Sequence, residues 1–414
     1  MALVGFGTVG QAVAKLLSAR ADEHSLELTH VFNRSVERKK SVWNSHHVHW
    51  TEDFNDVLAS DVDIVVELVG GVDHAYQWVR SALESGKSVV TANKQLMARH
   101  GSELMELARR KQRVLAYGAA VAGGVPVISG LHEGLGGDRL QKVCGVLNGT
   151  CNYILTRIER DGTSFADALL EAQKAGFAEA DPTDDVDGYD ARAKLVILAR
   201  AGLNAEVSPE QVVARSIRPL KRMDFDYANR LGCTIRQVSR AELGDGVLRA
   251  AVEPALVSQE SPLAKVSGSQ NLVMSMGEFG GETVFSGYGA GGNPTAVAVV
   301  SDLLYVVRLQ SQLMMEPDRP RPRQFDVNAD FTAARYLRFV VRDSAGIIAS
   351  LAGVLAEHQL NIDSILQLPG HEKSALPFVI TLEPCQTSEV ESAMEEIRKF
   401  SFLAEAPLNM PILH

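Results

Sequence analysis

The sequence predicts an α/β protein in three parts: a domain built on a parallel β-sheet, an α+β domain, and a ferredoxin-like βαββαβ unit at the C-terminus. Three observations support this order. Strand-like and helix-like segments alternate over residues 1–140, which indicates parallel strands joined by crossover helices. Helices and strand-like runs mix over residues 141–286. Residues 335–414 follow the order strand, helix, strand, strand, helix, strand.

In the first part, short apolar runs predict strands and longer amphipathic segments predict helices. The expected strands are Ala2–Gly5, Leu26–Phe32, Ile64–Leu68, Ser88–Thr91 and Val114–Tyr117. The expected helices are Gln11–Ser18, His74–Ser85 and Ser102–Lys111. These elements assign residues 1–140 to one domain, and we expect residues 287–315, which contain the apolar helix Thr295–Leu309, to complete it.

The same reasoning divides the rest of the chain. Residues 141–286 are expected to hold helices at Asn152–Arg160, Phe165–Ala175 and Ala191–Ala201, and a strand at Gly246–Val252. Glycine-rich Ser286–Pro294 is expected to be a loop, and residues 316–334, which begin with a Pro/Arg-rich stretch, a linker. The C-terminal unit is expected to contain strands Tyr336–Val341, Asn361–Gln367 and Phe378–Leu382, a weak fourth strand, and helices Ile347–His358 and Ser388–Phe400.

The composition is typical of a folded globular protein, with 46% hydrophobic and 22% charged residues. The net charge of −10 argues against a nucleic-acid-binding protein. No apolar run reaches the roughly 18 residues that span a bilayer, and the N-terminus lacks the basic segment of a signal peptide, so we expect no membrane association and a cytoplasmic location. The four cysteines fit neither a zinc site nor a CxxC pair and are expected to be reduced.

The segment Gly5–Gly10 matches the pattern G-x-G-x-x-G between a predicted strand and a predicted helix. In a Rossmann-type domain, Gly5 would permit the tight turn, Gly7 would let the backbone approach a pyrophosphate, and Gly10 would allow close packing of helix and strand. Backbone N–H groups and the helix dipole would then face the phosphates. The sequence therefore predicts a nicotinamide dinucleotide site, with a plain strand–helix turn as the alternative.

The end of the second predicted strand bears on the choice between NAD and NADP. NAD-binding proteins usually place an acidic residue there, whereas this chain has Asn33 and Arg34, with Lys39 close behind. An arginine suits a 2′-phosphate because its planar donors can bind one in bidentate fashion. We therefore predict NADP, with NAD as the alternative and a solvated surface arginine as the competing interpretation.

A lysine and an acidic segment are the next candidates for chemistry. Lys94 follows a predicted parallel strand at the sheet edge where ligands bind, and it can neutralise a carbonyl oxygen or a carboxylate. The segment Ala178–Lys194 holds five aspartates and one glutamate. Asp190 and Lys194 are four residues apart on a predicted helix, so they share a face and hold each other charged. A surface lysine and a solvated acidic loop are the alternatives, and the EF-hand spacing is absent.

Together the motifs resemble the homoserine dehydrogenase family over essentially residues 1–310. The matching motifs are Gly5–Gly10, Glu67–Gly71, Thr91–Lys94, Val121–Pro126, Leu147–Ile154, Glu179–Pro182, Asp190–Lys194 and Gly287–Gly292. The C-terminal unit resembles an ACT domain, an amino-acid-sensing module, through Asp343–Gly346 and Asn361. The chain shows no upstream kinase-like segment, which suggests a monofunctional member.

The resemblance implies reduction of aspartate 4-semialdehyde to homoserine, on the route to threonine and methionine, and hence to isoleucine. It implies that Lys194 donates a proton to the carbonyl oxygen, that Asp190 orients Lys194 or relays its proton, and that Lys94 lies at the reacting centre. The substrate-binding residues that it implies are Glu179, Asp185, Thr150 and Gly149. The cofactor contacts expected from motif and resemblance are Gly5, Gly7, Thr8, Val9, Gly10, Arg34, Lys39, Thr91, Lys94, Gly289 and Gly291.

The resemblance also implies two further ligands. Main-chain carbonyls of Val121, Gly123 and Val125 can bind sodium or potassium, although the glutamate that the family often has beside them is Gly118 here. The ACT-like unit implies an effector, threonine, at Asp343, Gly346 and Asn361, where a helix start presents free N–H groups. A structural unit without a ligand is the alternative. The family suggests a homodimer through the second domain, which pairing of ACT units would raise to a homotetramer.

Three other functions remain open from sequence alone. The first is another NADP-linked dehydrogenase that acts on a small amino-acid aldehyde or oxo acid. A phosphorylating aldehyde dehydrogenase would use a cysteine nucleophile, and Cys144 and Cys151 are the candidates, neither with an obvious histidine partner. A catalytically silent amino-acid sensor would keep the scaffold but has no physical need for Lys94, Glu179, Asp190 and Lys194 together.

Overall fold

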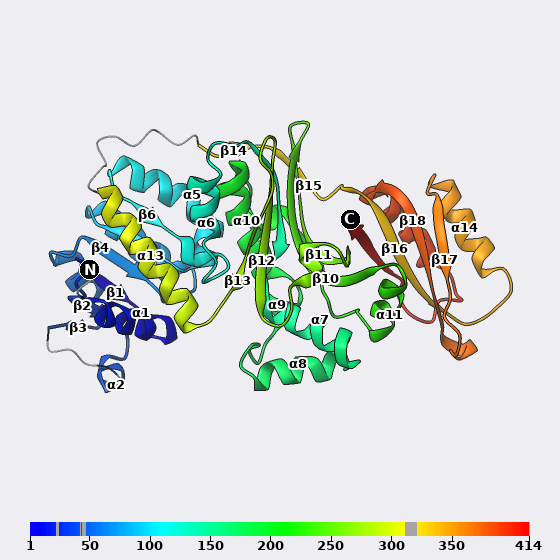
Figure 1. Ribbon diagram of the computed structural model, residues 1–414, viewed down its shortest axis with the longest axis horizontal. Helices are drawn as coiled ribbons and strands as arrows, with labels where there is room; N and C mark the ends of the chain where they lie inside the picture. The colour runs from blue at the N-terminus through cyan, green and yellow to red at the C-terminus, as the bar shows by residue number, and fades with distance from the viewer. Residues whose placement is uncertain (22–24, 42, 44–46, 311–320, 414) are drawn as a thin grey trace.

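The computed structural model describes residues 1–414 except 22–24, 42, 44–46, 311–320 and 414. The molecule is elongated, with the N-terminal sheet at one end and the C-terminal unit at the other (Figure 1). Parts of the predicted linker 316–334 and of the predicted segment 287–315 lie outside the described residues. In the described part, no helix is long and apolar enough to cross a membrane.

The N-terminal sheet has six parallel strands in the order β3-β2-β1-β4-β5-β6. This order reverses beside β1, and the arrangement confirms the predicted Rossmann-type sheet. Its strands are β1 (Ala2–Val4), β2 (His30–Phe32), β3 (His49–Thr51), β4 (Ile64–Glu67), β5 (Ser88–Thr91) and β6 (Leu115–Ala116). The glycine loop therefore lies at the switch point where such sheets bind their ligands.

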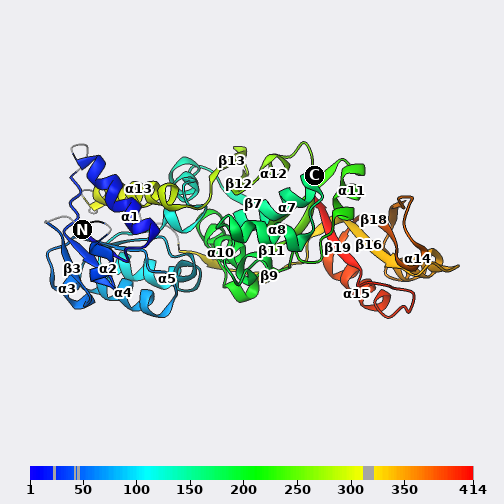
Figure 2. The same cartoon turned by 90° about the horizontal axis from the view of Figure 1, so that it is seen from below.

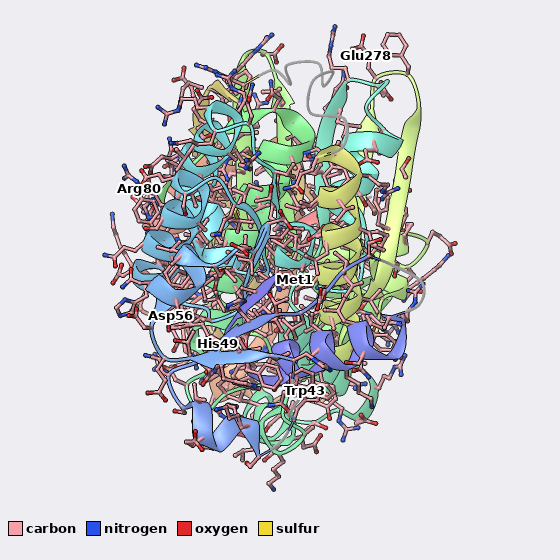
Figure 3. The ribbon with its side chains drawn as sticks, turned by 90° about the vertical axis from the view of Figure 1, so that its left-hand side faces the viewer. Met1, Trp43, His49, Asp56, Arg80 and Glu278 are labelled. Atoms are coloured by element: carbon pink, nitrogen blue, oxygen red, sulfur yellow. The ribbon has the colours of Figure 1, made fainter. Side chains whose placement is uncertain are left out.

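Helices cover both faces of this sheet. One face packs against α1 (Thr8–Ala19) and α13 (Gly292–Gln310), and the other against α3 (Phe54–Ala59), α4 (Asp73–Glu84) and α5 (Lys94–Arg110). Figure 2 shows these two helical layers on opposite sides of the sheet. Figure 3 looks onto this end of the molecule, with Met1 at the start of β1 in the middle and Arg80 of α4 on the outside.

A second sheet of eleven strands runs through the rest of the molecule, with the main order β13-β12-β7-β10-β11-β19-β16-β18-β17, and β14 and β8 form a separate two-stranded sheet. Its first strands are β7 (Leu140–Val146), β10 (Cys233–Gly244), β11 (Val247–Ser258), β12 (Gln270–Gly277) and β13 (Gly281–Tyr288), with the short β9 (Val213–Ala214) and β15 (Asp326–Asn328) beside β11. Apolar cores join the sheet to helices, among them α7 (Gly149–Asp161), α8 (Phe165–Lys174), α10 (Tyr189–Leu203) and α11 (Arg222–Arg230). Shorter elements are α2 (Val36–Lys40), α6 (Val127–Ser129), α9 (Thr183–Val186), α12 (Pro262–Lys265), β8 (Ala205–Glu206) and β14 (Arg323–Gln324).

The C-terminal unit continues the second sheet. It contains β16 (Thr332–Val341), α14 (Ile347–Glu357), β17 (Ile362–Leu366), β18 (Leu376–Gln386), α15 (Thr387–Ile397) and β19 (Leu408–Leu413), which confirms the predicted βαββαβ order. β19 pairs in parallel with β11, joining Leu256 to Ile412 and Val257 to Leu413. The unit is therefore hydrogen-bonded into the preceding domain through its last strand.

Several predicted elements were wrong in extent. The second strand begins at His30, not Leu26, and β3 and α3 were not predicted. The helix predicted at Ser102 begins at Lys94. The strand predicted at Gly246–Val252 is one arm of the long hairpin β10–β11, and the predicted loop Ser286–Pro294 spans the end of β13 and the start of α13.

Candidate active site

The glycine loop between β1 and α1 has the geometry of a dinucleotide-binding turn. Gly5 adopts φ 100°, in the left-handed region that glycine tolerates, and its N–H donates to the Phe32 carbonyl at 3.0 Å. A Cβ on Gly10 would lie 2.5 Å from the Gly5 carbonyl oxygen, so α1 packs this closely only without a side chain there. A Cβ on Gly7 would meet no atom within 4 Å. The start of α1 thus has open space beside it that can accept a phosphate.

Alanine at these two glycines is expected to have different effects. Gly7→Ala should leave the melting temperature of the free protein unchanged but weaken NADPH binding at least about tenfold, because its methyl group stands where the pyrophosphate approaches. Gly10→Ala should destabilise the free protein by about 1–3 kcal/mol, because its methyl group overlaps the Gly5 carbonyl. Thermal melts and NADPH fluorescence titrations measure the two effects, and equal melting of both variants would contradict this account of the loop.

Arg34 lies just beyond β2, at the same sheet edge as the glycine loop. β1 and β2 pair in parallel, with Val4 beside Phe32, so the chain leaves both strands at one edge. Arg34 is exposed there, and Lys39 lies on the short helix α2 that follows. The residue directly after β2 is Asn33, whose side chain accepts from the Ser35 N–H at 3.0 Å. An amide and then a cation, and no acid, therefore follow β2.

Two lysines from different domains share one buried carboxylate. Lys94 begins α5, while Asp190 and Lys194 lie one turn apart on α10, as their spacing predicts. The Lys194 ammonium donates to Asp190 Oδ2 at 2.7 Å and to the Leu147 carbonyl at 2.8 Å. The Lys94 ammonium forms an ion pair with the other oxygen, Asp190 Oδ1. The Asp190 side chain is 6% exposed and that of Lys94 is 40% exposed, so the carboxylate is the enclosed centre of the cluster.

Asp190 and Lys94 hold each other ionised. Burial opposes ionisation of Asp190, but the ammonium groups of Lys194 and Lys94 outweigh it and hold the pKa of this carboxyl well below its usual range. Burial likewise opposes the charge on Lys94, and Asp190 overcomes it, so the pKa of Lys94 is raised. The cluster therefore keeps a cation in place at neutral pH, which is what a developing alkoxide requires.

Asn148 ties Asp190 to a second carboxylate. Its Nδ2 donates to Asp190 Oδ2 at 2.8 Å and to Asp185 Oδ1 at 2.6 Å. Its Oδ1 caps α7 by accepting from the Cys151 N–H at 2.8 Å. Burial raises the pKa of Asp185. Sequence reasoning missed Asn148, although an asparagine directly before a helix is a preferred N-cap and was the available signal.

A cavity of about 290 Å³ joins the two groups of residues. The glycine loop contributes Val9, and both Lys94 and Lys194 lie on its wall. The remaining lining residues follow β4 and β5, or belong to the segments around 119–123 and 289–295: Leu68, Val69, Gly70, Ala92, Asn93, Ala119, Ala120, Ala122, Gly123, Gly289, Ala290 and Thr295. The glycine loop and the lysine cluster therefore face the same space between the two domains.

All four predicted substrate-binding residues, Glu179, Asp185, Thr150 and Gly149, lie outside this lining. Glu179 is exposed, in the segment before α9. The Thr150 hydroxyl donates to the Phe177 carbonyl at 2.7 Å. A Cβ on Gly149 would lie 2.8 Å from the Ser269 carbonyl oxygen, so this glycine lets α7 approach that backbone. Their roles toward substrate stay predictions. The predicted cofactor contact Thr91 donates from its hydroxyl to Glu67 Oε2 at 2.7 Å, and its role toward the cofactor stays a prediction.

The segment predicted to bind a monovalent cation packs against the start of α13. A Cβ on Gly123 would lie 2.6 Å from the Gly289 carbonyl oxygen. The Val125 carbonyl already accepts from the Val127 N–H at 2.8 Å. Among the residues that the structure describes, no cluster of three His, Cys, Asp or Glu side chains could hold a metal ion. The cation site, including Val121, stays a prediction.

An aspartate from α13 stands where a side chain at position 118 would extend. A Cβ on Gly118 would lie 2.6 Å from Asp302 Oδ1, and the Ala119 N–H donates to Asp302 Oδ2 at 3.2 Å. Burial raises the pKa of Asp302 to about 7. The space left by the absent glutamate side chain is thus filled by a carboxylate from a distant segment, which sequence reasoning missed.

The predicted effector residues lie on the exposed end of the C-terminal unit. Asp343 and Gly346 belong to the turn before α14, and Gly346 adopts φ 92° as the residue that precedes the helix. The Asp343 carboxylate lies 3.5 Å from the Lys373 ammonium. Asn361 instead donates from its side chain to Glu383 Oε2 at 3.2 Å. The turn has the predicted form, and its ligand stays a prediction.

The two cysteines considered as nucleophiles are buried as thiols. Burial raises the pKa of Cys144 to about 11 and that of Cys151 well above its usual range. A thiolate is the reactive form of cysteine, so neither side chain is suited to attack an aldehyde. The alternative of a phosphorylating aldehyde dehydrogenase therefore loses its required residue.

Comparison with known proteins identifies the family of this chain. The family model for homoserine dehydrogenase matches residues 126–304, that for the homoserine dehydrogenase NAD-binding domain matches 5–118, and that for the ACT domain matches 335–402. The homoserine dehydrogenase of Bacillus subtilis is 37% identical over 391 residues, covering 92% of this chain and 90% of the relative. That of Pseudomonas aeruginosa is 36% identical and covers 91% of this chain and 90% of the relative.

Solved structures give the same result. A homoserine dehydrogenase from Thiobacillus denitrificans superposes with a TM-score of 0.91 at 31% identity, covering 99% of this chain and 97% of the other. A hyperthermophilic archaeal homoserine dehydrogenase in complex with NADPH superposes with a TM-score of 0.65 at 27% identity, covering 78% of this chain and 98% of the other. On the strength of these matches and of the lysine–aspartate cluster, the chain belongs to the homoserine dehydrogenase family and carries a C-terminal ACT domain.

Proposed function

We propose that this oxidoreductase reduces aspartate 4-semialdehyde to homoserine with NADPH, and catalyses the reverse reaction with NADP, in threonine and methionine synthesis. The observation that carries the proposal is the pair of ammonium groups on Asp190, at the wall of a cavity that the glycine loop also lines. The bound cofactor supplies a hydride to the aldehyde carbon. Substrate binding and protonation of the carbonyl oxygen depend on residues of the chain itself.

Lys194 has the geometry of a proton donor to the carbonyl oxygen. Two of its three N–H bonds point to Asp190 and the Leu147 carbonyl, which leaves the third for a substrate oxygen in the cavity. As the hydride adds, negative charge grows on that oxygen, and an ammonium fixed beside it both stabilises the charge and transfers the proton. Lys94 adds a second positive charge, and Asp190 keeps both lysines oriented. Asp185, Glu179, Thr150 and Gly149 are proposed to hold the substrate.

NADP is the proposed cofactor because Arg34 follows β2 with no acid at position 33. Substituting Arg34→Glu should lower kcat/KM with NADP by roughly 10- to 100-fold, the cost of a lost charge-assisted bond, and leave that with NAD nearly unchanged. Arg38→Glu, on the exposed side of α2, is the matched charge control. Equal losses with both cofactors would show that Arg34 does not contact the 2′-phosphate. The archaeal relative bound to NADPH is consistent with this choice.

Threonine is the proposed effector of the ACT domain, at the turn Asp343–Gly346, and pairing of these domains within a homodimer or homotetramer is proposed to complete its site. Deleting the domain is a poor test, because β19 is hydrogen-bonded to β11. Asp343→Ala should raise the threonine concentration for half-inhibition at least about tenfold by removing a carboxylate partner for the ammonium group. Lys373→Ala removes the other partner of the ion pair with Asp343. This substitution should leave the threonine concentration for half-inhibition unchanged.

A spectrophotometric assay of homoserine oxidation with NADP and with NAD, run with and without threonine, tests the proposal. Homoserine-dependent formation of NADPH supports substrate and cofactor, and its suppression by threonine supports the effector. Absence of turnover in a protein that binds NADPH would overturn the proposed reaction and favour the silent sensor. A sodium or potassium requirement, measured in the same assay, tests the predicted cation at Val121, Gly123 and Val125.

A further inference from the structure

We infer that Arg200 is a positioning residue that fixes the two halves of the active site relative to each other. The inference rests on the proposed function, because it concerns how Lys94 meets Asp190 and Lys194. Lys94 belongs to α5 of the first domain, whereas its partners belong to α10 of the second. The ion pair between the domains exists only while these helices hold one separation, and a shift of about 1 Å in such a site can cost on the order of a hundredfold in rate.

The Arg200 side chain, on the last turn of α10, reaches into α5 one turn beyond Lys94. Its Nη1 donates to the Met97 carbonyl at 2.7 Å, and Nη2 lies 3.4 Å from the Ala98 carbonyl. The Arg200 side chain is only 4% exposed. A buried charge bonded to backbone holds its position more firmly than a solvated one, because moving it would leave both the charge and its acceptors without partners.

Glu206, in β8, binds both the Arg200 side chain and helix α5. Its Oε1 accepts from Arg200 Nη2 at 2.9 Å, its Oε2 lies 3.3 Å from Arg200 Nε, and Ser102 of α5 donates its hydroxyl to the same Oε2. One carboxylate therefore binds the guanidinium in bidentate fashion and also holds α5 directly. The ion pair between Arg99 and Glu210 also joins α5 to the second domain, but both side chains are exposed, so we expect little from it.

Gly101 makes room for this contact. A Cβ on Gly101 would lie 2.6 Å from Arg200 Nη1 and 3.2 Å from Met97 Cε. A glycine inside a helix such as α5 costs about 1 kcal/mol relative to alanine, so its presence needs a packing reason. The approach of the guanidinium to the helix backbone supplies that reason. Helix α5 is thus shaped to receive Arg200 at a fixed depth.

Steady-state kinetics of homoserine oxidation over a range of pH, on the full chain, tests the inference with Arg200→Lys. Lysine keeps the charge but lacks the planar guanidinium that binds the carboxylate in bidentate fashion while it also reaches the two carbonyls. We expect kcat to fall roughly 10- to 100-fold with the KM for the cofactor within about twofold of wild type. We also expect the alkaline limb of kcat to move at least about one pH unit lower, because Lys94 loses the nearby Asp190 that raises its pKa.

Arg236→Lys is the matched control. Arg236 is equally buried and also binds one glutamate, Glu159, at 2.9 Å, but its contacts lie wholly within the second domain. The Arg236→Lys substitution should lower thermal stability without shifting the alkaline limb of the pH profile of kcat. If Arg200→Lys loses stability in the same way and keeps the kcat and pH profile of wild type, the inference is overturned. An inactive wild-type protein would instead overturn the proposed function.

Gly101→Ala disturbs the same contact from the side of α5. This variant provides the test if Arg200→Lys folds poorly. The added methyl should displace the guanidinium and give the same fall in kcat and the same pH shift. In an Arg200→Lys background, Gly101→Ala should change neither kcat nor the alkaline limb further, because the Nη1 atom that the methyl group would crowd is absent. Additive losses in this double-mutant cycle would show that the two residues act independently and would contradict the inference.

Discussion

Lys194→Met is expected to lower kcat for homoserine oxidation by about a thousandfold or more, while NADPH binding changes little. Methionine retains the length of the side chain but removes the ammonium that we assign as proton donor. It also leaves Asp190 with one ammonium partner in place of two. Stopped-flow or steady-state assays measure the loss in rate, and NADPH fluorescence titration shows that the cofactor still binds.

Lys142→Met is the control for this substitution. Lys142 lies on β7 and also pairs with a carboxylate, Glu242, at 2.9 Å, but its side chain is 41% exposed and lies outside the cavity lining. Its kcat should stay within about twofold of wild type because an exposed ion pair contributes little. A Lys194→Met enzyme that retained a tenth of the wild-type kcat would remove Lys194 from the proposed chemistry.

Asp224→Ala is expected to destabilise the protein by about 3–5 kcal/mol, because it leaves a buried arginine without its counter-ion. Asp224 is fully buried where α11 meets the ACT domain. Its carboxylate accepts from Tyr336 Oη at 2.9 Å, from the Lys221 N–H at 2.8 Å and from Arg338. Urea denaturation followed by circular dichroism measures the loss, with attention to a separate early transition for the ACT domain.

Asp226→Ala provides the comparison on the same helix. Asp226 pairs with Arg222 at 2.9 Å, and both side chains are more than 40% exposed. Its removal should cost less than about 1 kcal/mol, as for other exposed ion pairs. Similar losses for the two aspartates would mean that burial at the domain junction does not determine the strength of the Asp224 contacts.

Sequence patterns predicted the fold best where apolar and polar side chains repeat regularly along a single helix or strand. The parallel sheet, α10 with its Asp190–Lys194 pair, and the βαββαβ unit all rest on local periodicity, and the structure has them. The hairpin β10–β11 was predicted only in part, because it carries charged residues that are nevertheless buried. Arg240 and Glu253 are such a pair, 3.2 Å apart across two strands, and neither residue reveals the other in the linear sequence.

The parts of the site that were missed depend on contacts between distant segments. Asp302 fills the space beside Gly118 from α13, and Arg200 lies against Gly101 within helix α5. A glycine in a linear sequence indicates a helix end as readily as a close contact, and only the packed structure separates the two. Glu179 is exposed in the structure, and the substrate contact that its motif implies stays a prediction.

The position of α13 has a consequence for synthesis on the ribosome. This helix buries Val299, Leu303 and Val306 against the first sheet, yet it follows strands β7 and β10–β13 of the second domain in the chain. When the six strands of the first sheet have emerged, one of its faces still lacks half of its helical cover. The first domain therefore cannot finish folding until residues near 306 leave the exit tunnel, and apolar surface around Leu3, Val66 and Val90 stays unprotected until then. A chain halted before α13 would be a target for chaperones, whereas one halted after it would have a complete cofactor domain.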